Sequence, residues 1–277
     1  DIAVCGSSAC IFVYGRQNMI FESHAHYDDK AFDQDREELL GSLGENGIGY
    51  VINIGANIET TKNTIRLAEK YPFIYGAAGV HPSDTDELNE ENFIWLKEQC
   101  SHPKIVAVGE IGLDYYWDEP DRKIQKKWFE RQLKMAKEVK LPVIIHSRDA
   151  AKETLDMMKA EHAEDIGGVI HCFSYTKEIA REYLNMDYSF GIGGVVTFQN
   201  AKKLKEAVEY IPLEKILLET DSPYLAPVPN RGKRNSSLNL RFIAEEIAAI
   251  KSLDYEDVIR ITEENAKKLF GINGSER

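Results

Sequence analysis

The chain alternates short apolar runs with longer amphipathic segments, and this alternation restricts the fold more than any other feature of the sequence. The runs are rich in β-branched residues and have the length expected of buried strands. They span residues 19–23, 50–54, 73–80, 105–110, 141–146, 168–171, 188–192 and 215–219. Helical periodicity begins near residues 34, 58, 91, 123, 149, 176, 200 and 237, and a further amphipathic segment covers 255–269.

Eight strand–helix units in about 250 residues predict an α/β protein whose parallel strands are covered by helices. A (β/α)8 TIM barrel with an extra C-terminal helix is favoured over an open doubly wound sheet. The open sheet would need a glycine-rich phosphate turn after its first strand, and none is present there. We expect residues 19–277 to form this single domain and residues 1–18 to be an extension outside the core.

The formal net charge of −12 argues against a protein that binds nucleic acid passively through a basic face. It does not exclude an enzyme acting on phosphodiesters, because bound divalent cations reverse the local field. No apolar run approaches the ~20 residues that cross a bilayer, so no membrane association is expected. The four cysteines are scattered, which indicates a cytoplasmic protein rather than a disulfide-linked secreted one.

A His-Ala-His sequence closes the first apolar run. In an extended strand, side chains two residues apart lie on the same face, so His24 and His26 should point the same way. Two converging imidazoles make half of a metal site. Alternatively, the two histidines lie close together by chance on a surface strand.

Further polar groups follow other apolar runs at the point where each run ends. The six groups that could bind a metal in this way are His24, His26, Glu110, His146, His171 and Asp221. Any one of them could instead cap a helix or form a hydrogen bond in the core. Because a barrel brings the carboxyl ends of its strands to one face, the six together predict a site for two divalent ions, Zn²⁺, Mn²⁺ or Mg²⁺.

Such a site favours hydrolysis by a metal-bound hydroxide. Glu110 is predicted to bridge the two ions, and Asp221 to be both a ligand and the acceptor of a proton from the attacking water. Glu219 lies two residues before Asp221 and is predicted to hydrogen-bond a ligand histidine or to hold a water molecule. Glu219 could equally be a structural acid of the barrel interior.

Several residues near the same strand ends are candidates for contacts with a substrate. They are His81, Asp114 and Arg148, together with Arg231, Lys233 and Arg234 of the proline-rich loop at 223–239. The position of this loop after the eighth strand, where barrels often bind phosphate, favours phosphate contact over a solvated surface. Aromatic residues after strand ends, Tyr115, Tyr116, Trp117 and Phe173, could stack on a base or simply pack the loops.

Six segments of the chain resemble the TatD family of metal-dependent hydrolases, within the wider amidohydrolase-like barrels. They are 22–26 (ESHAH), 79–82 (GVHP), 109–115 (GEIGLDY), 141–148 (LPVIIHSR), 171–174 (HCFS) and 218–225 (LETDSPYL). The resemblance extends over about residues 19–270, and the six predicted ligands match the metal-binding positions of that family. Glu22 stands where many members have Asp. Glu110 stands where related dinuclear amidohydrolases have a carbamylated lysine, which lowers the expectation of their chemistry.

The resemblance implies a deoxyribonuclease, acting as a 3′-to-5′ exonuclease on DNA, with single-stranded ends as the expected substrate and no obligate protein partner. One alternative is an amide or lactone hydrolase that acts on a small metabolite with the same two metals. Another is a barrel without activity that keeps metals for stability, which the intact ligand set argues against. Charge reversal of Arg231, Lys233 and Arg234 should cripple a nuclease, whereas it should leave a hydrolase of small neutral substrates little changed.

Overall fold

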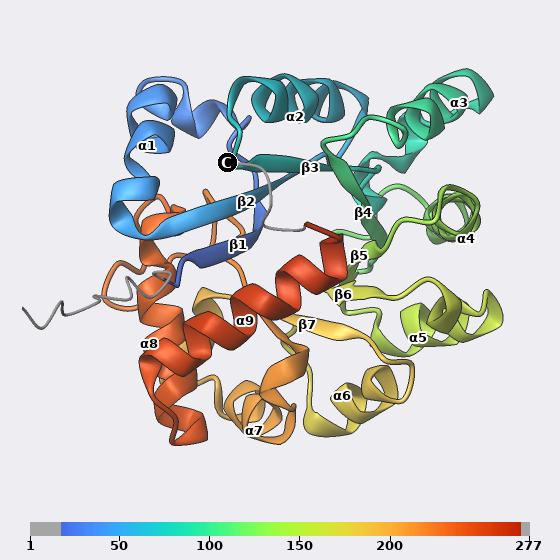
Figure 1. The fold of residues 1–277 in the computed structure, drawn as a ribbon. Coiled ribbons are helices and arrows are strands. Elements are labelled where there is room, and N and C mark those ends of the chain that lie inside the picture. Colours follow the sequence, from blue (N-terminus) through green and yellow to red (C-terminus); the bar gives the residue numbers. More distant parts are fainter. Residues whose placement is uncertain (1–17, 273–277) are drawn as a thin grey trace, which may run out of the picture.

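Eight parallel strands follow one another around a barrel in the order of the sequence (Figure 1). The computed structural model describes residues 18–272, so the predicted N-terminal extension lies almost wholly outside the described part. The strands are β1 Ile20–Ala25, β2 Ile48–Ile54, β3 Ile74–Ala78, β4 Ile105–Asp114, β5 Val143–Arg148, β6 Gly168–Ile170, β7 Ser189–Ile192 and β8 Ile216–Leu218. The predicted (β/α)8 barrel is confirmed.

Helices connect the strands and cover the outside of the barrel (Figure 1). They are α1 Arg36–Ser42, α2 Ile58–Lys70, α3 Glu90–Gln99, α4 Arg122–Val139, α5 Ala151–Ala160, α6 Lys177–Leu184, α7 Lys202–Tyr210, α8 Leu240–Lys251 and α9 Tyr255–Phe270. Polar caps set some of the starts: the Asn57 side chain accepts a hydrogen bond from the backbone of Thr60, and Asp121 does the same for Lys123. No helix within residues 18–272 is long and apolar enough to cross a membrane.

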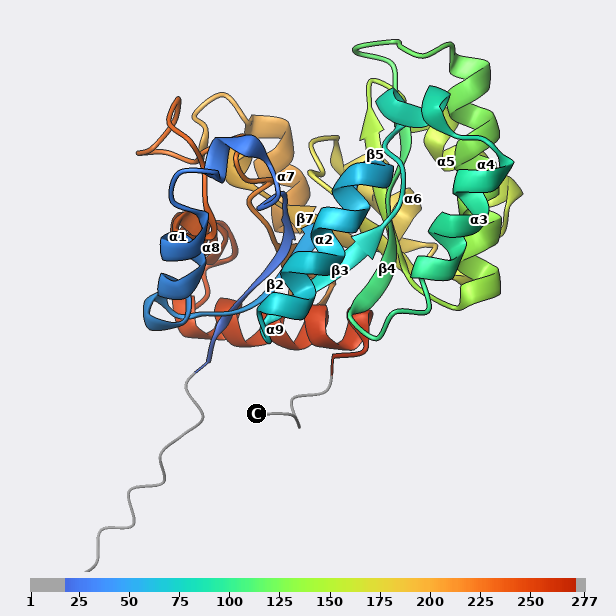
Figure 2. The same cartoon turned by 90° about the horizontal axis from the view of Figure 1, so that it is seen from above.

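Helix α9 is the predicted extra helix, and it crosses the end of the barrel where the strands begin (Figure 2). Its residues Ala266 and Phe270 join a buried apolar cluster with Phe21, Ile52 and Leu217. Phe21 stacks on Phe270 with ring centroids 6.1 Å apart. This end of the barrel is therefore filled with apolar side chains, and the polar residues are left to the opposite end.

Strand β4 is longer than the sequence predicted. It continues through Glu110 to Asp114, because Ile111 and Leu113 are fully buried and Ile111 pairs with Ile145 of β5. The pairing with β5 shifts register between Val108 and Ile111. Glu110 consequently lies within the strand at an irregularity, rather than at the strand end as expected.

The seam between β1 and β8 closes the barrel near the polar end. The backbone N–H of Asp221 donates to the carbonyl of His24 at 2.9 Å, and the N–H of His26 donates to the carbonyl of Ser222 at 2.8 Å. A single isolated parallel bridge joins Ala25 to Ser222. The residues that close the barrel are thus the residues that carry, or adjoin, the candidate metal ligands.

Candidate metal centre

Strand periodicity points several polar side chains into the upper end of the barrel. His146 and His171 come two residues after Ile144 and Val169, which belong to the buried cluster inside the barrel. Because alternate residues of a strand share a face, these histidines point inward as well. Glu219 has the same relation to Leu217, and it is 1% exposed.

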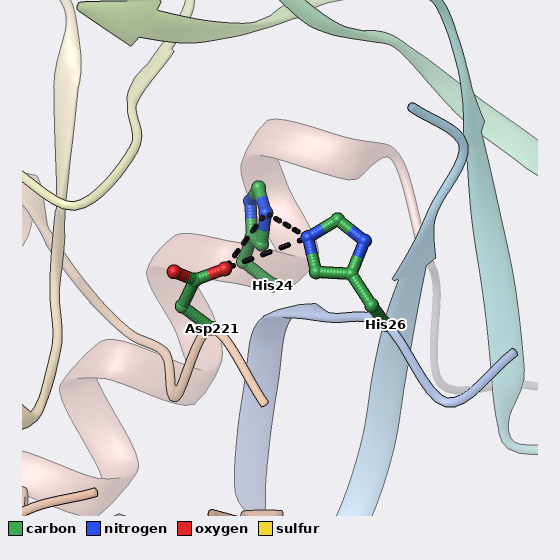
Figure 3. A group of neighbouring side chains, drawn as sticks. All are labelled: His24, His26 and Asp221. Carbon is green, nitrogen blue, oxygen red and sulfur yellow. Dashed lines mark hydrogen bonds and ion pairs between the residues drawn. The ribbon is translucent and has the colours of Figure 1, made fainter. Parts of the chain in front are cut away.

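His24, His26 and Asp221 form the first group of candidate ligands (Figure 3). The Nε2 atoms of the two histidines are 3.2 Å apart, so the imidazoles converge as predicted from their spacing. Asp221 Oδ1 lies 3.4 Å from Nε2 of His26 and 3.8 Å from Nε2 of His24. Asp221 has a φ of 56°, a left-handed conformation that aspartate tolerates better than most residues.

Glu110 lies between this group and a second one. Its Oε2 is 3.4 Å from Nε2 of His24 and 3.9 Å from Nε2 of His26. Its Oε1 faces the other way, 2.7 Å from Nδ1 of His146 and 3.7 Å from Nε2 of His171. The two oxygens of one carboxylate therefore face two different pairs of histidines.

Glu219 packs against His171. Its Oε1 accepts a hydrogen bond of 2.6 Å from the backbone N–H of Cys172 and lies 3.1 Å from Nδ1 of His171. The direction of the second contact is not that of a hydrogen bond, and this nitrogen is left without a hydrogen-bond partner. A Cβ atom on Gly191 would lie 1.9 Å from Glu219 Oε2, so only glycine leaves room for the carboxylate.

Two further buried acids hold the candidate ligands in place. Asp114 is 1% exposed, and its Oδ2 is 3.0 Å from Nε2 of His146, on the side of the ring away from Glu110. A carboxylate on the far side of a ligand histidine fixes its orientation and is common around protein metals. Glu22 accepts hydrogen bonds from the backbones of His24 and Thr220 and contacts the Ser237 hydroxyl, which ties β1 to the β8 loop.

Glu22 was noted in the sequence only because many TatD-family members have Asp at this position, and no role was predicted for it. The signal was available, because an acid two residues before His24 in a buried strand needs buried partners. Burial raises the pKa of Glu22 to about 8, although the hydrogen bonds that it receives oppose this.

The acids and imidazoles shift one another's proton affinities. Burial alone would lower the pKa of His26 and of His171, but the neighbouring carboxylates outweigh burial and raise the two values to about 9 and about 10. Burial would raise the pKa of Glu110, yet the charges of His171 and His24 hold it well below the usual range. The pKa of Asp221 is also lowered, against burial, through its bond with His26. The centre thus holds ionised carboxylates beside the protonated imidazoles of His26 and His171, whereas burial lowers the pKa of His24.

This donor set fits divalent metal ions. Imidazole nitrogens and carboxylate oxygens are the ligands that Zn²⁺ and Mn²⁺ take in proteins. His24 is fully buried, its Nδ1 has no hydrogen-bond partner, and its ring stacks on His171 with centroids 3.5 Å apart. Such a crowded, buried set of imidazoles is costly without a cation to bind. The four histidines, Glu110 and Asp221 are the residues that would hold divalent ions here.

The residues predicted to contact substrate lie at different distances from the candidate ligands. His81 lies at the centre, with Nε2 4.0 Å from Glu110 Oε1. Arg148 is exposed beside it in a cleft. In the basic loop, Arg234 forms a two-pronged pair with Asp35 at 2.5 and 2.6 Å, so its charge is already matched. The Arg231 guanidinium lies 4.3 Å from the Phe198 ring.

Two clefts meet at the candidate ligands. One, of about 730 Å³, is lined by Trp117, Arg148, Cys172, Val195 and Leu225 in addition to residues of the centre. The other, of about 480 Å³, is lined by Asp28, Asp29, Lys30, Thr60 and Asp84. His81, His146, His171 and Asp221 line both. The cations of the basic loop, Arg231, Lys233 and Arg234, line neither cleft. The acidic wall formed by Asp28, Asp29 and Asp84 was not predicted, because its residues come from separate segments with no shared motif.

Comparisons with known proteins agree with this geometry. Residues 21–271 match the family model described as TatD related DNase. An uncharacterised metal-dependent hydrolase of Bacillus subtilis, YabD, is 44% identical over 92% of this chain and all of its own length. A protein of Rahnella named 3′-5′ ssDNA/RNA exonuclease TatD is 31% identical over 92% of this chain and 99% of its own.

Solved structures include the same architecture. The crystal structure of YjjV, a TatD homologue of Escherichia coli, superposes with a TM-score of 0.87. It is 28% identical in sequence, and the match covers 93% of this chain and 100% of the other. The barrel and its C-terminal helix are therefore shared with a TatD homologue.

Proposed function

The chain belongs to the TatD-related DNase family of metal-dependent hydrolases, and from this premise we propose that it hydrolyses phosphodiester bonds at single-stranded ends of DNA, as a 3′-to-5′ exonuclease. The name of the Rahnella relative, 3′-5′ ssDNA/RNA exonuclease TatD, supports this substrate class. The proposed ligands of two divalent ions are His24, His26, Glu110, His146, His171 and Asp221.

The observation that carries the proposal is the position of Glu110. One of its oxygens faces His24 and His26, and the other faces His146 and His171. Two cations held about one carboxylate suit displacement at phosphorus, where both the attacking and the leaving oxygen develop negative charge. Bound divalent ions would supply an activated water molecule and neutralise the charge of the phosphate.

The side chains around Glu110 have distinct roles in this proposal. Asp221 has a lowered pKa and is ionised at neutral pH, so its carboxylate can accept a proton from the attacking water. Burial lowers the pKa of His81 to about 3, and its Nδ1 accepts a hydrogen bond from the backbone of Ser83. The ring is therefore neutral with its proton on Nε2, which faces the centre and can donate to a phosphate oxygen.

An assay of end-labelled single-stranded DNA tests the proposal. The protein is stripped with a chelator and reloaded separately with Zn²⁺, Mn²⁺ and Mg²⁺, and the Asp221→Asn variant serves as the inactive control. We expect stepwise shortening from the 3′ end with at least one ion and none after chelation. Absence of cleavage with every ion would overturn the proposal. Hydrolysis of small lactones or amides instead would favour the alternative enzyme class.

A further inference from the structure

An exposed aromatic pair stands at the edge of the larger cleft. Tyr116 is 55% exposed and Trp117 is 63% exposed, and both follow β4 on the loop to α4. The two rings are perpendicular, with centroids 5.1 Å apart. The guanidinium of Arg148, at the end of β5, lies 3.8 Å from the centroid of Tyr116 and 5.9 Å from that of Trp117. Tyr and Trp are enriched at interfaces, because each combines a large apolar ring with a polar tip.

The pair is held in a fixed position relative to the metal centre. Asp114 Oδ1 accepts hydrogen bonds from the backbone N–H groups of Tyr116 and Trp117, each at 3.0 Å. The other oxygen of the same carboxylate contacts His146, a proposed ligand. One buried acid therefore contacts the proposed ligand and also anchors the backbone that carries the aromatic pair.

The charges of the two clefts differ. The smaller cleft carries Asp28, Asp29 and Asp84, with Lys30 as the only lysine or arginine that lines it among residues 18–272. The larger cleft carries Arg148 on a wall of apolar and aromatic side chains, with the shared Asp221 at its base. A polyanion is repelled by the aspartates of the smaller cleft and attracted by Arg148 in the larger cleft. A strand that reaches the metals must therefore approach across Trp117 and Arg148.

We propose that Trp117, with Tyr116 and Arg148, forms a subsite that stacks an unpaired base of a single-stranded polynucleotide beside the metal centre. This inference rests on the proposed function and adds the subsite that selects single strands. Stacking on an aromatic face tolerates every base, and a cationic guanidinium beside it serves the phosphate without reading the sequence. A base in the interior of a duplex is stacked on both faces and leaves no face for the indole, so the subsite favours unpaired bases.

Kinetics of the Trp117→Ala and Trp117→Phe variants test the subsite. On single-stranded DNA we expect Trp117→Ala to raise KM by about 5- to 150-fold, the range for loss of base stacking, and Trp117→Phe to raise it much less. Tyr210→Ala is the matched control. Tyr210 is a 47% exposed aromatic residue at the end of α7, on the side of the barrel where β8 begins. Abasic sites near the 3′ end of the substrate should abolish the difference between wild type and Trp117→Ala.

A binding measurement separates failure of the subsite from failure of the proposed function. The probe is a single-stranded oligonucleotide with phosphorothioate linkages at its 3′ end, added to metal-loaded protein while tryptophan fluorescence is recorded. We expect quenching that is lost in Trp117→Phe and weaker with the matching duplex. Equal KM values and equal quenching in wild type and variant would overturn the subsite even if DNA is cleaved. Quenching that depends on Trp117 would support it even if no cleavage occurs.

Discussion

Replacing Gly191 by alanine should weaken metal binding without touching any proposed ligand. The added Cβ would lie 1.9 Å from Oε2 and 2.5 Å from Cδ of Glu219, and real contacts of this kind are not shorter than 3.0 Å. The carboxylate must therefore move by about 1.1 Å, the difference between 1.9 and 3.0 Å. A movement of that size is enough to break the 2.6 Å bond from the N–H of Cys172 and to draw Glu219 away from His171.

The size of the effect follows from the contacts that are lost. A hydrogen bond to a charged group contributes about 1.5–3 kcal/mol, and loss of the acid that orients a ligand histidine typically costs about 10- to 100-fold in metal affinity. We therefore expect Gly191→Ala to bind Zn²⁺ about 10- to 100-fold more weakly, measured by titration against a competing chelator dye. In a Glu219→Gln background, the same change should add little, because the two act through one contact.

Gly193→Ala is the matched control for this experiment. It adds the same methyl group two residues further along the chain, where the new Cβ would lie 3.6–3.8 Å from Glu219. That is an ordinary van der Waals contact, and the extended backbone at Gly193 is open to alanine. Unchanged Zn²⁺ affinity in Gly191→Ala, or an equal loss in Gly193→Ala, would refute the role assigned to Glu219.

Three further predictions concern the centre and its surroundings. Replacing His24 and His26 together by alanine should remove one of two bound ions, and full occupancy by elemental analysis would contradict their role as ligands. Because carboxylates raise the pKa of His26 to about 9 and of His171 to about 10, metal must displace protons from both at pH 7. The apparent affinity for metal should therefore keep rising between pH 7 and 9. Calorimetry in buffers of different ionisation enthalpy should show proton release on metal binding. A plateau in metal affinity above pH 7 would count against these pKa shifts. Arg234→Ala should change KM for DNA by less than about threefold, because its charge is already matched by an aspartate. A larger rise in KM would show that the pair opens for substrate.

The fold could be predicted because its signal is local and repeated. Buried parallel strands are apolar along their whole length, as in β2, where all seven residues are buried. Strand lengths were less certain, since pairing rather than composition decided that β4 continues through Gly112 to Asp114. The convergence of His24 and His26 followed from the two-residue period of a strand, and the ring nitrogens are 3.2 Å apart.

Contacts between distant loops could not be predicted in the same way. No pattern in the sequence connects Arg234 with its partner Asp35, which lies 199 residues earlier. The room that Gly191 leaves for Glu219 depends on how β7 and β8 pair, with Gly191 opposite Leu217. The acidic wall has the same origin, since Asp28 and Asp84 come from separate loops. The sequence predicts which residues face the centre, and side-chain packing decides which of them remain free.

If the proposed ions bind, the seam between β1 and β8 would couple their binding to the stability of the barrel closure. The carbonyl of His24 and the amide of His26 close the seam with Asp221 and Ser222, while the side chains of His24, His26 and Asp221 face the proposed ions. Ions that bind only the closed form stabilise it by mass action. The amides of His26 and Asp221 should then exchange with deuterium more slowly when metal is bound, and the first strand should loosen when it is removed. The barrel should then resist proteolysis when metal is bound. When metal is removed, local unfolding should begin at this seam.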